Sequence, residues 1–189
     1  DFCHVDSEGN VLWRGHYDFP KEQGFPIETL IGSSTPAAGL HAITYRTAIL
    51  REIEYRQTEG CAYTDMEWAT IPMANVRIAG YFDEFLVYYL VGRDGQTMQP
   101  EIYFRDFPIV MRLALGNLGK MIALSEKMTD ARCRYLRDLI RRQLNSVYQY
   151  CILSIKRHAL LPRLQQFDED VKRFDAEMYD DLWNSYIEI

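Results

Sequence analysis

The chain has 189 residues, 48% of them hydrophobic, and a formal net charge of -6 with a sequence pI near 5.2. This length and apolar content suffice for one hydrophobic core, and length alone favours one domain over two. Domains that bind the phosphate backbone of nucleic acids are usually basic, so the acidic balance argues against nucleic acid as a partner.

The N-terminal 40 residues predict a hairpin followed by a loop. Two short alternating runs flank the turn-forming cluster Asp6–Asn10, which is typical of a β-hairpin over residues 2–17. Residues 18–40 contain three prolines and three glycines, which indicates mostly loop. One short helix fits at 27–32.

Two helices are predicted next. The apolar positions of Tyr45–Ile53 fit one side of a short helix. Thr64 can cap a second helix, with Glu67 three residues later as the other half of a capping box. We expect this second helix to run to about Val76.

The second half of the chain changes from strands to helices. Aromatic and β-branched runs at 77–82 and 85–91 predict two extended segments. After Pro100 apolar residues recur at helical spacing, and Pro108 and Pro162 each suit a first helical turn. The fold class is therefore α+β, mostly α. The expected C-terminal helices span 108–127, 130–159 and 162–186.

The cysteines and the apolar runs indicate neither a metal site nor a membrane protein. The four cysteines are scattered without a CxxC pair, which favours buried free thiols in a reducing compartment. We find no apolar stretch of the roughly 18 residues that a membrane helix needs, and no basic signal-peptide region at the start. We therefore expect a cytoplasmic chain without a transmembrane segment.

The densest group of chemically versatile residues is Tyr63–Trp68. Asp65 lies in a predicted first helical turn, where it is either a functional carboxylate or a partner of the helix dipole. Glu67 has the capping box as a sufficient structural explanation. Trp68 could stack on a sugar or belong to the core. His41 could be a base, a ligand or a structural hydrogen-bonding residue.

A second group is the glycine-containing turn Gly92–Thr97. Its glycines allow a close approach to a ligand, and Arg93, Gln96 and Thr97 can donate hydrogen bonds to phosphate oxygens. The spacing is not that of a P-loop or a dinucleotide fingerprint. An anion site and a mobile polar turn are both compatible with it.

Three segments are distinctive in their order and spacing, namely His41–Leu50, Tyr63–Trp68 with Pro72, and Tyr88–Thr97. Taken together, they resemble bacterial family 2 glycosyltransferases of the GT-A type. The match covers about a third of the chain.

The resemblance implies roles for named residues. Asp65 would be the catalytic base, taking the proton from an acceptor hydroxyl that attacks the anomeric carbon of a nucleotide sugar in an inverting displacement. The donor diphosphate would lie against Arg93, Gln96 and Thr97, which offset the charge on the leaving group. The acceptor or sugar contacts would be His41, Glu67 and Trp68.

The nucleotide-binding half of that family, with its DxD metal motif, is not recognisable in this sequence. We therefore expect residues 1–100 to form an incomplete, acceptor-side part of a GT-A domain and residues 101–189 a C-terminal helical extension. The Mg or Mn ion of the parent enzyme would be bound by residues outside this sequence, and the segment alone would be inactive.

The expected partners of the parent enzyme are a nucleotide-sugar donor and a saccharide or lipid-linked acceptor. We expect it in the cytoplasm, with a peripheral position at the inner membrane as a variant, and we expect self-association through exposed apolar surface. The alternative function is a non-catalytic helical interaction module. A hydrolase that uses Asp65 and Glu67 is disfavoured, because carboxylates two residues apart on a helix diverge.

Overall fold

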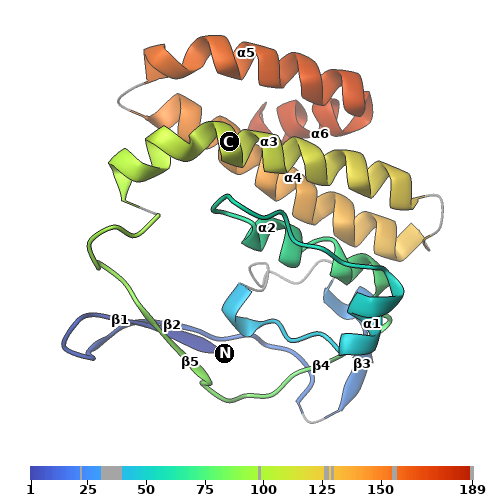
Figure 1. The fold of residues 1–189 in the computed structure, drawn as a ribbon. Helices are drawn as coiled ribbons and strands as arrows, with labels where there is room; N and C mark the ends of the chain where they lie inside the picture. The colour runs from blue at the N-terminus through green and yellow to red at the C-terminus, as the bar shows by residue number, and fades with distance from the viewer. Residues whose placement is uncertain are drawn as a thin grey trace.

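The computed structural model is 58% helical, with its strands in two small sheets, which confirms the predicted mostly α, α+β fold. The long helices lie together above the part of the chain that contains the strands (Figure 1). The described residues are 1–21, 23–30, 40–97, 99–125, 128, 130–154 and 157–187.

The first sheet contains the predicted hairpin. Strands β1 (Phe2–Val5) and β2 (Val11–Gly15) are antiparallel, and β5 (Val87–Leu90) pairs with β1 in parallel, so the strand order is β2-β1-β5. The Asp6 carboxylate closes the hairpin turn by accepting hydrogen bonds from the backbone N–H and the side-chain amide of Asn10, at 2.8 and 2.9 Å. Because these hydrogen bonds join residues close together in the chain, the turn could be predicted from the sequence.

The second sheet was only partly anticipated. Strand β4 (Ile78–Gly80) lies in a predicted extended segment, but its antiparallel partner β3 (Gly24–Pro26) lies in the stretch predicted as mostly loop. The 3₁₀ turn η1 (Ile27–Leu30) confirms the short helix expected there. Residues 31–39 lie outside the described part.

The first two helices are short. Helix α1 (Thr47–Glu52) confirms the prediction. Helix α2 (Asp65–Trp68) covers one turn and is followed by the 3₁₀ turn η3 (Pro72–Asn75). The predictions of one helix running to about Val76 and of a capping box at its start are therefore wrong. Pro72 has no N–H, and its ring would clash with the carbonyl of residue 68 in a continuous α-helix. Thr64 makes no side-chain cap.

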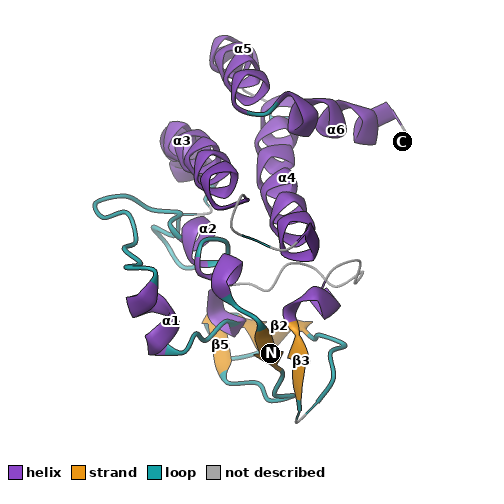
Figure 2. Cartoon of the chain, turned by 90° about the vertical axis from the view of Figure 1, so that its right-hand side faces the viewer, coloured by secondary structure: helices purple, strands orange, loops and turns teal. Residues whose placement is uncertain are grey.

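Four helices form the upper part of the molecule. Helix α3 packs on α4, α4 contacts α5 and α6, and α6 contacts α5 and runs at a wide angle to it (Figures 1 and 2). Their bounds are α3 (Pro100–Ser125), α4 (Asp130–Leu153), α5 (Arg157–Phe174) and α6 (Ala176–Ile187).

The prolines do not start these helices, contrary to the prediction. Pro108 and Pro162 lie inside α3 and α5, while Pro100 occupies the first position of α3. A proline inside a helix costs about 3 kcal/mol, and the buried α3 residues around Pro108 offset it. The expected last helix is divided at Asp175, whose carboxylate accepts a hydrogen bond from the Met178 N–H at 2.9 Å and caps α6.

The main core joins the two parts of the chain. Ile27, Met73 and Val76 lie in one buried cluster with Phe107 of α3 and Leu144 of α4. Residues before and after position 100 therefore share this core. A smaller buried cluster lies under the strands and contains Phe2, Tyr17, Phe25 and Tyr81.

Helix α3 is long and apolar enough to cross a membrane by length and composition, which the sequence reading did not anticipate. Among the described residues it is the one helix that meets this test, and 44% of its apolar window is buried inside the fold. Its buried face includes Phe107, Ala114 and Leu118, and α3 packs on α4. The helix thus serves as a core helix here.

Candidate functional site

Helix α2 holds Asp65 at an open position. Asp65 is the exposed first residue of α2, and its carboxylate has no hydrogen bond or ion pair within the described residues. Hydrogen bonds from Gln143 of α4 hold this helix in place. The Gln143 amide donates to the Met66 carbonyl at 3.3 Å and to the Thr70 hydroxyl at 2.8 Å. Asn117 of α3 in turn donates to Gln143 at 3.0 Å.

Tyr63 connects Asp65 to the glycine-containing turn. Its φ angle is 66°, in the left-handed region that a bulky residue rarely adopts. This backbone lets the Tyr63 hydroxyl donate to the Thr97 carbonyl at 2.7 Å, while its ring meets the Tyr103 ring at 5.4 Å. Partial burial raises the pKa of Tyr63, so the hydroxyl stays a donor at neutral pH. Strained residues of this kind cluster at functional sites.

The turn Gly92–Thr97 is closed by its own side chains. The Gln96 amide donates to the Leu90 carbonyl at 2.6 Å and its oxygen accepts from the Arg93 N–H at 3.1 Å. Gln96 therefore supports the turn. Arg93 is exposed, and its guanidinium makes no ion pair within the described residues. Of the residues predicted to bind a diphosphate, Arg93 is the one whose charged group is open to a ligand.

Glu67 is a buried structural residue. Its side chain is 3% exposed, and its oxygens accept from the Thr58 N–H and hydroxyl at 2.8 Å and from the Lys120 ammonium at 2.9 Å. Burial by itself raises the pKa of Glu67, but these hydrogen bonds outweigh burial and hold the pKa below its usual value. No open face is left for an acceptor, so the predicted acceptor contact at Glu67 is corrected to a structural one.

Trp68 and His41 also have structural neighbours. The Trp68 ring meets the Tyr45 and Tyr55 rings edge-on at 4.9 and 5.8 Å. His41, in the 3₁₀ turn η2 (Leu40–Ala42), packs its ring against that of Tyr89 of β5 in a tilted arrangement, with the ring centroids 4.5 Å apart. His41 thus lies on the first sheet and Trp68 in a tyrosine cluster, and neither residue's contacts include Asp65.

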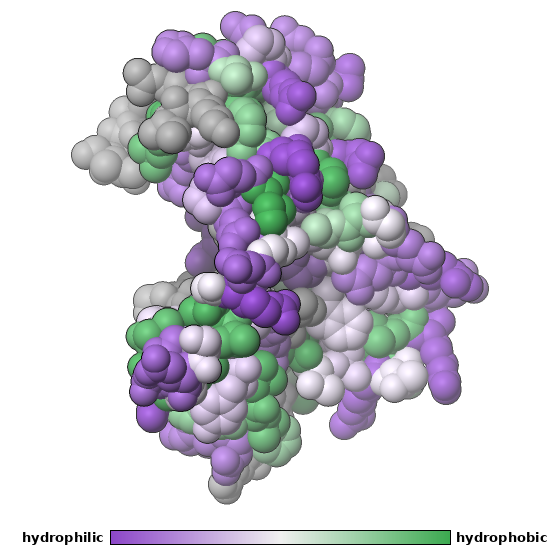
Figure 3. Space-filling view, turned by 60° about the vertical axis from the view of Figure 1, so that its left-hand side comes forward, coloured by the Kyte–Doolittle hydropathy of each residue, from purple (hydrophilic) through white to green (hydrophobic). Residues whose placement is uncertain are grey.

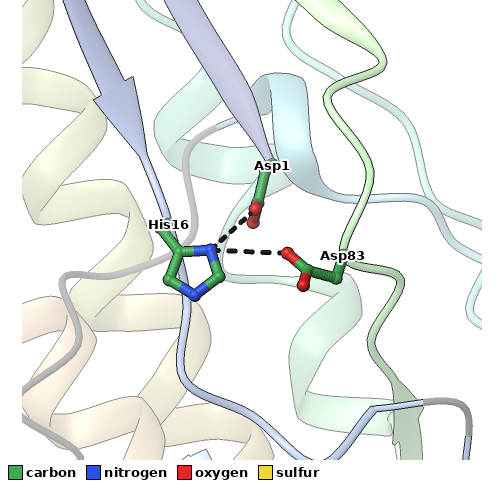
Figure 4. Close-up of side chains that lie close together, drawn as sticks. All are labelled: Asp1, His16 and Asp83. Carbon is green, nitrogen blue, oxygen red and sulfur yellow. Dashed lines mark hydrogen bonds and ion pairs between the residues drawn. The ribbon is translucent and has the colours of Figure 1, made fainter.

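One group of side chains within the described residues has the spacing of metal ligands. The ligand atoms of Asp1, His16 and Asp83 lie within 4.8 Å of one another (Figure 4). His16 Nδ1 is 3.0 Å from an Asp1 oxygen and 3.5 Å from an Asp83 oxygen. The sequence reading missed this group because its members are far apart in the chain.

Other side chains already satisfy these carboxylates. The Tyr81 hydroxyl donates to the buried Asp1 carboxylate at 2.8 Å, and Lys21 forms an ion pair with Asp83. The Lys21 hydrogen bond is the main reason why the pKa of Asp83 lies below its usual value. The arrangement can therefore serve as an ion-pair network that fastens the hairpin to the segment after β4, and we assign no metal to it.

A pocket of about 450 Å³ lies between the start of α3 and the end of α4. None of its lining residues was predicted from the sequence to belong to a functional site. Tyr103 is one of them, so the pocket adjoins the Tyr63 side chain. The surface on one side of the molecule is hollowed between the helical part and the strand-bearing part (Figure 3). The lining residues are Pro100, Tyr103, Ser146, Gln149, Tyr150, Leu153 and Ser154.

Comparison with known proteins gives no assignment. No protein-family model matches the chain, and searches of curated proteins and of solved structures found no significant match.

Proposed function

We propose that this chain forms the acceptor side of a nucleotide-sugar-dependent glycosyltransferase in which Asp65 is the general base. The observation that carries the proposal is the hydrogen bond from the Tyr63 hydroxyl to the Thr97 carbonyl. It joins two segments 34 residues apart, to which the resemblance gives complementary roles, the acceptor base and the donor diphosphate loop.

The state of the Asp65 carboxylate suits this role. A general base has to be ionised and within reach of an acceptor hydroxyl. Asp65 is exposed, and no cation or donor of the described residues occupies its oxygens. By contrast, Glu67 is buried and fully engaged. Of the two carboxylates on α2, Asp65 is the one that can accept a proton from a bound molecule.

The proposed reaction is an inverting displacement. The acceptor oxygen gives its proton to Asp65 and forms a bond to the anomeric carbon, while the bond to the diphosphate oxygen breaks and the nucleoside diphosphate leaves with the electron pair. Arg93 offsets part of the negative charge on the leaving group. The Mg or Mn ion implied by the resemblance would stabilise the same diphosphate, and no described residue is assigned to bind it.

The acceptor would be a saccharide or a lipid-linked saccharide, and the enzyme would work in the bacterial cytoplasm or at the inner face of the inner membrane. The core position of α3 supports a peripheral arrangement, because a helix that packs on α4 already has a protein neighbour for its apolar face.

The test is Asp65→Asn in the full-length enzyme, which keeps the shape of the side chain and removes the proton acceptor. We expect kcat to fall by about 10²- to 10⁴-fold, the typical contribution of a general base, with donor affinity unchanged. Asp180→Asn is the matched control, since Asp180 is an exposed aspartate of α6. Wild-type transfer by the Asp65→Asn enzyme would refute the proposed role.

The alternative, a helical interaction module, is favoured by exposed apolar side chains on the C-terminal helices. Such side chains can mark a docking or self-association surface. A module of this kind has no need of Asp65, so partner binding that is insensitive to Asp65→Asn, in a protein without transferase activity, distinguishes it. The exposed side chains are Ile152, Leu153, Leu161, Phe174 and Trp183.

A further inference from the structure

The pocket between α3 and α4 has an aromatic corner. The Tyr103 and Tyr150 rings meet edge-on, with centroids 4.6 Å apart and an interplanar angle of 77°. Phe107 supports Tyr150 from within the core at 4.4 Å, so the corner is backed by a buried side chain. Aromatic faces of this kind suit the apolar C–H face of a sugar ring.

Polar but uncharged groups surround this corner. None of the seven described residues that line the pocket is charged. Gln149 is exposed and its amide has no partner among the described residues, so it can both donate and accept. The Ser146 hydroxyl donates to the Gln143 carbonyl at 2.7 Å and keeps its lone pairs for a ligand.

The tyrosine hydroxyls are neutral donors at physiological pH. Burial raises the pKa of Tyr103 to about 12, and it also raises the pKa of Tyr150. The described lining residues therefore offer no cation to balance a diphosphate or a carboxylate. The combination of aromatic faces with neutral hydrogen-bonding groups fits a neutral, polyhydroxylated ligand.

The pocket is next to the proposed catalytic segment. Tyr103 contacts Tyr63, and Tyr63 is two residues before Asp65. The volume of about 450 Å³ lies within the usual range for small-molecule sites, roughly 300–1,000 Å³. We propose that this pocket binds a neutral sugar ring of the saccharide acceptor, whose chain extends from there toward Asp65. Its role as an acceptor site rests on the proposed glycosyltransferase function, whereas saccharide binding itself can be tested separately.

The experiment is saturation-transfer difference NMR on the 189-residue chain with three neutral probes, maltotriose, cellotriose and chitotriose, and with glucuronic acid and n-hexanol as comparisons. We expect at least one neutral trisaccharide to bind and glucuronic acid not to bind. Gln149→Ala should weaken binding by roughly 3- to 10-fold, the effect of one neutral hydrogen bond. Ser146→Trp should abolish binding by filling the pocket.

Gln165→Ala is the matched control, because Gln165 is an exposed glutamine of α5 that does not line the pocket. Circular dichroism of each variant checks that the helices are intact. The proposal is overturned if no neutral trisaccharide binds, if Ser146→Trp leaves binding unchanged, or if n-hexanol competes as strongly as the sugars, which would indicate a purely apolar site.

The same titration with Asp65→Asn separates this inference from the proposed function. Binding that persists in Asp65→Asn supports a pocket distinct from the base. If the sugar binds but Asp65→Asn leaves transfer intact, the assignment of the base fails and the pocket stands. If Asp65→Asn abolishes transfer but no sugar binds at the pocket, the pocket assignment fails and the base stands.

Discussion

At the scale of single residues, Asp65 and Glu67 differ in exposure and in their hydrogen-bond partners because of their surroundings. Both belong to α2, two positions apart. The Asp65 carboxylate is exposed and has no partner among the described residues, whereas the Glu67 side chain is 3% exposed and accepts three hydrogen bonds. Spacing alone predicted that the two carboxylates diverge. It could not predict which one turns inward, because that depends on Lys120 of α3, which lies 53 residues away in the chain.

Lys120→Met is expected to destabilise the fold by leaving Glu67 buried without its cation. Removing one partner of a buried pair typically costs about 3–5 kcal/mol. Lys120 is about half exposed, with 47% of its side chain accessible, so water weakens the pair and we expect about 1–3 kcal/mol. Urea unfolding at neutral pH measures the change. Arg112→Met, at an exposed arginine of α3 with no ion pair within the described residues, is the control.

The same carboxylate predicts an acid-sensitive stability. The pKa of Glu67 is lower in the folded chain than its ordinary value of 4.5, because the Lys120 and Thr58 hydrogen bonds outweigh the larger single effect of burial, which raises it. At pH values above the ordinary pKa of a glutamate, the ionised Glu67 carboxylate therefore stabilises the fold. This stabilisation is lost as the pH falls from that ordinary pKa through the lowered pKa of Glu67 in the folded chain.

Glu67→Gln should lower stability at neutral pH and flatten the decline below about pH 4.5. Unfolding curves collected between neutral and acidic pH measure both effects. An acid-induced loss of stability that is as steep in Glu67→Gln as in the wild type would assign the pH dependence to other carboxylates, with the network of Asp83 and Lys21 as the first to test.

At the scale of elements, α2 depends on a polar junction between helices. Asn117 is fully buried, and its amide donates to Gln143, which donates to Met66 and Thr70 of the α2 segment. Gln143→Leu should cost about 1–3 kcal/mol because it leaves the buried Asn117 amide unpaired. The double variant with Asn117→Leu should cost less than the sum of the single changes, since both polar partners are then removed.

A double-mutant cycle by urea unfolding tests this junction. Additive effects would mean that the two amides act independently. Because the junction fixes α2, the proposed glycosyltransferase function predicts that Gln143→Leu also lowers transfer activity in the full-length protein, although Gln143 is not one of the proposed substrate-binding residues. The measurement is the kcat of the Gln143→Leu variant, which should fall at an assay temperature at which the variant is still folded.

Local patterns predicted the elements whose causes are local. The hairpin turn is closed by Asp6 and Asn10, which are four residues apart, and the region after Pro100 is helical as expected. The bounds differ, because the helix expected over 130–159 ends at Leu153. Strand β3 could not be predicted this way, because its pairing partner β4 lies more than fifty residues away. The division at Asp175 was missed because one capping carboxylate interrupts an otherwise continuous apolar pattern.

The candidate site was predicted in part. Asp65 and Arg93 have the exposure expected of functional residues, whereas Glu67 is internal. The left-handed backbone of Tyr63 and the hydrogen bond from its hydroxyl to the Thr97 carbonyl could not be predicted from the sequence, because tyrosine rarely adopts a positive φ. The pocket was missed because its lining combines the first turn of α3 with the last turns of α4, and only the packing of those helices brings them together.

At the scale of the whole molecule, the core decides how the chain can be divided. The boundary expected at residue 100 separates strands from long helices, but Ile27, Met73 and Val76 are buried with residues of α3 and α4. A contiguous core of this kind unfolds as one cooperative unit in small domains. We therefore expect a single unfolding transition for the chain, with the same midpoint by tryptophan fluorescence and by far-ultraviolet circular dichroism.

A segment of residues 101–189 alone should lose that cooperativity. Removing the first hundred residues uncovers the faces of α3 and α4 that pack on α2, η1 and η3, and an exposed apolar face of that size favours association or a loosely packed state. The measurements are the steepness of thermal unfolding by circular dichroism and the binding of an anilinonaphthalene dye. We expect a broad transition with strong dye binding for residues 101–189 and a sharp one with weak binding for the whole chain. A sharp transition of the shorter segment at an unchanged temperature would mean that α3 to α6 form an independently stable bundle. The contacts of Ile27, Met73 and Val76 would then add little to its stability.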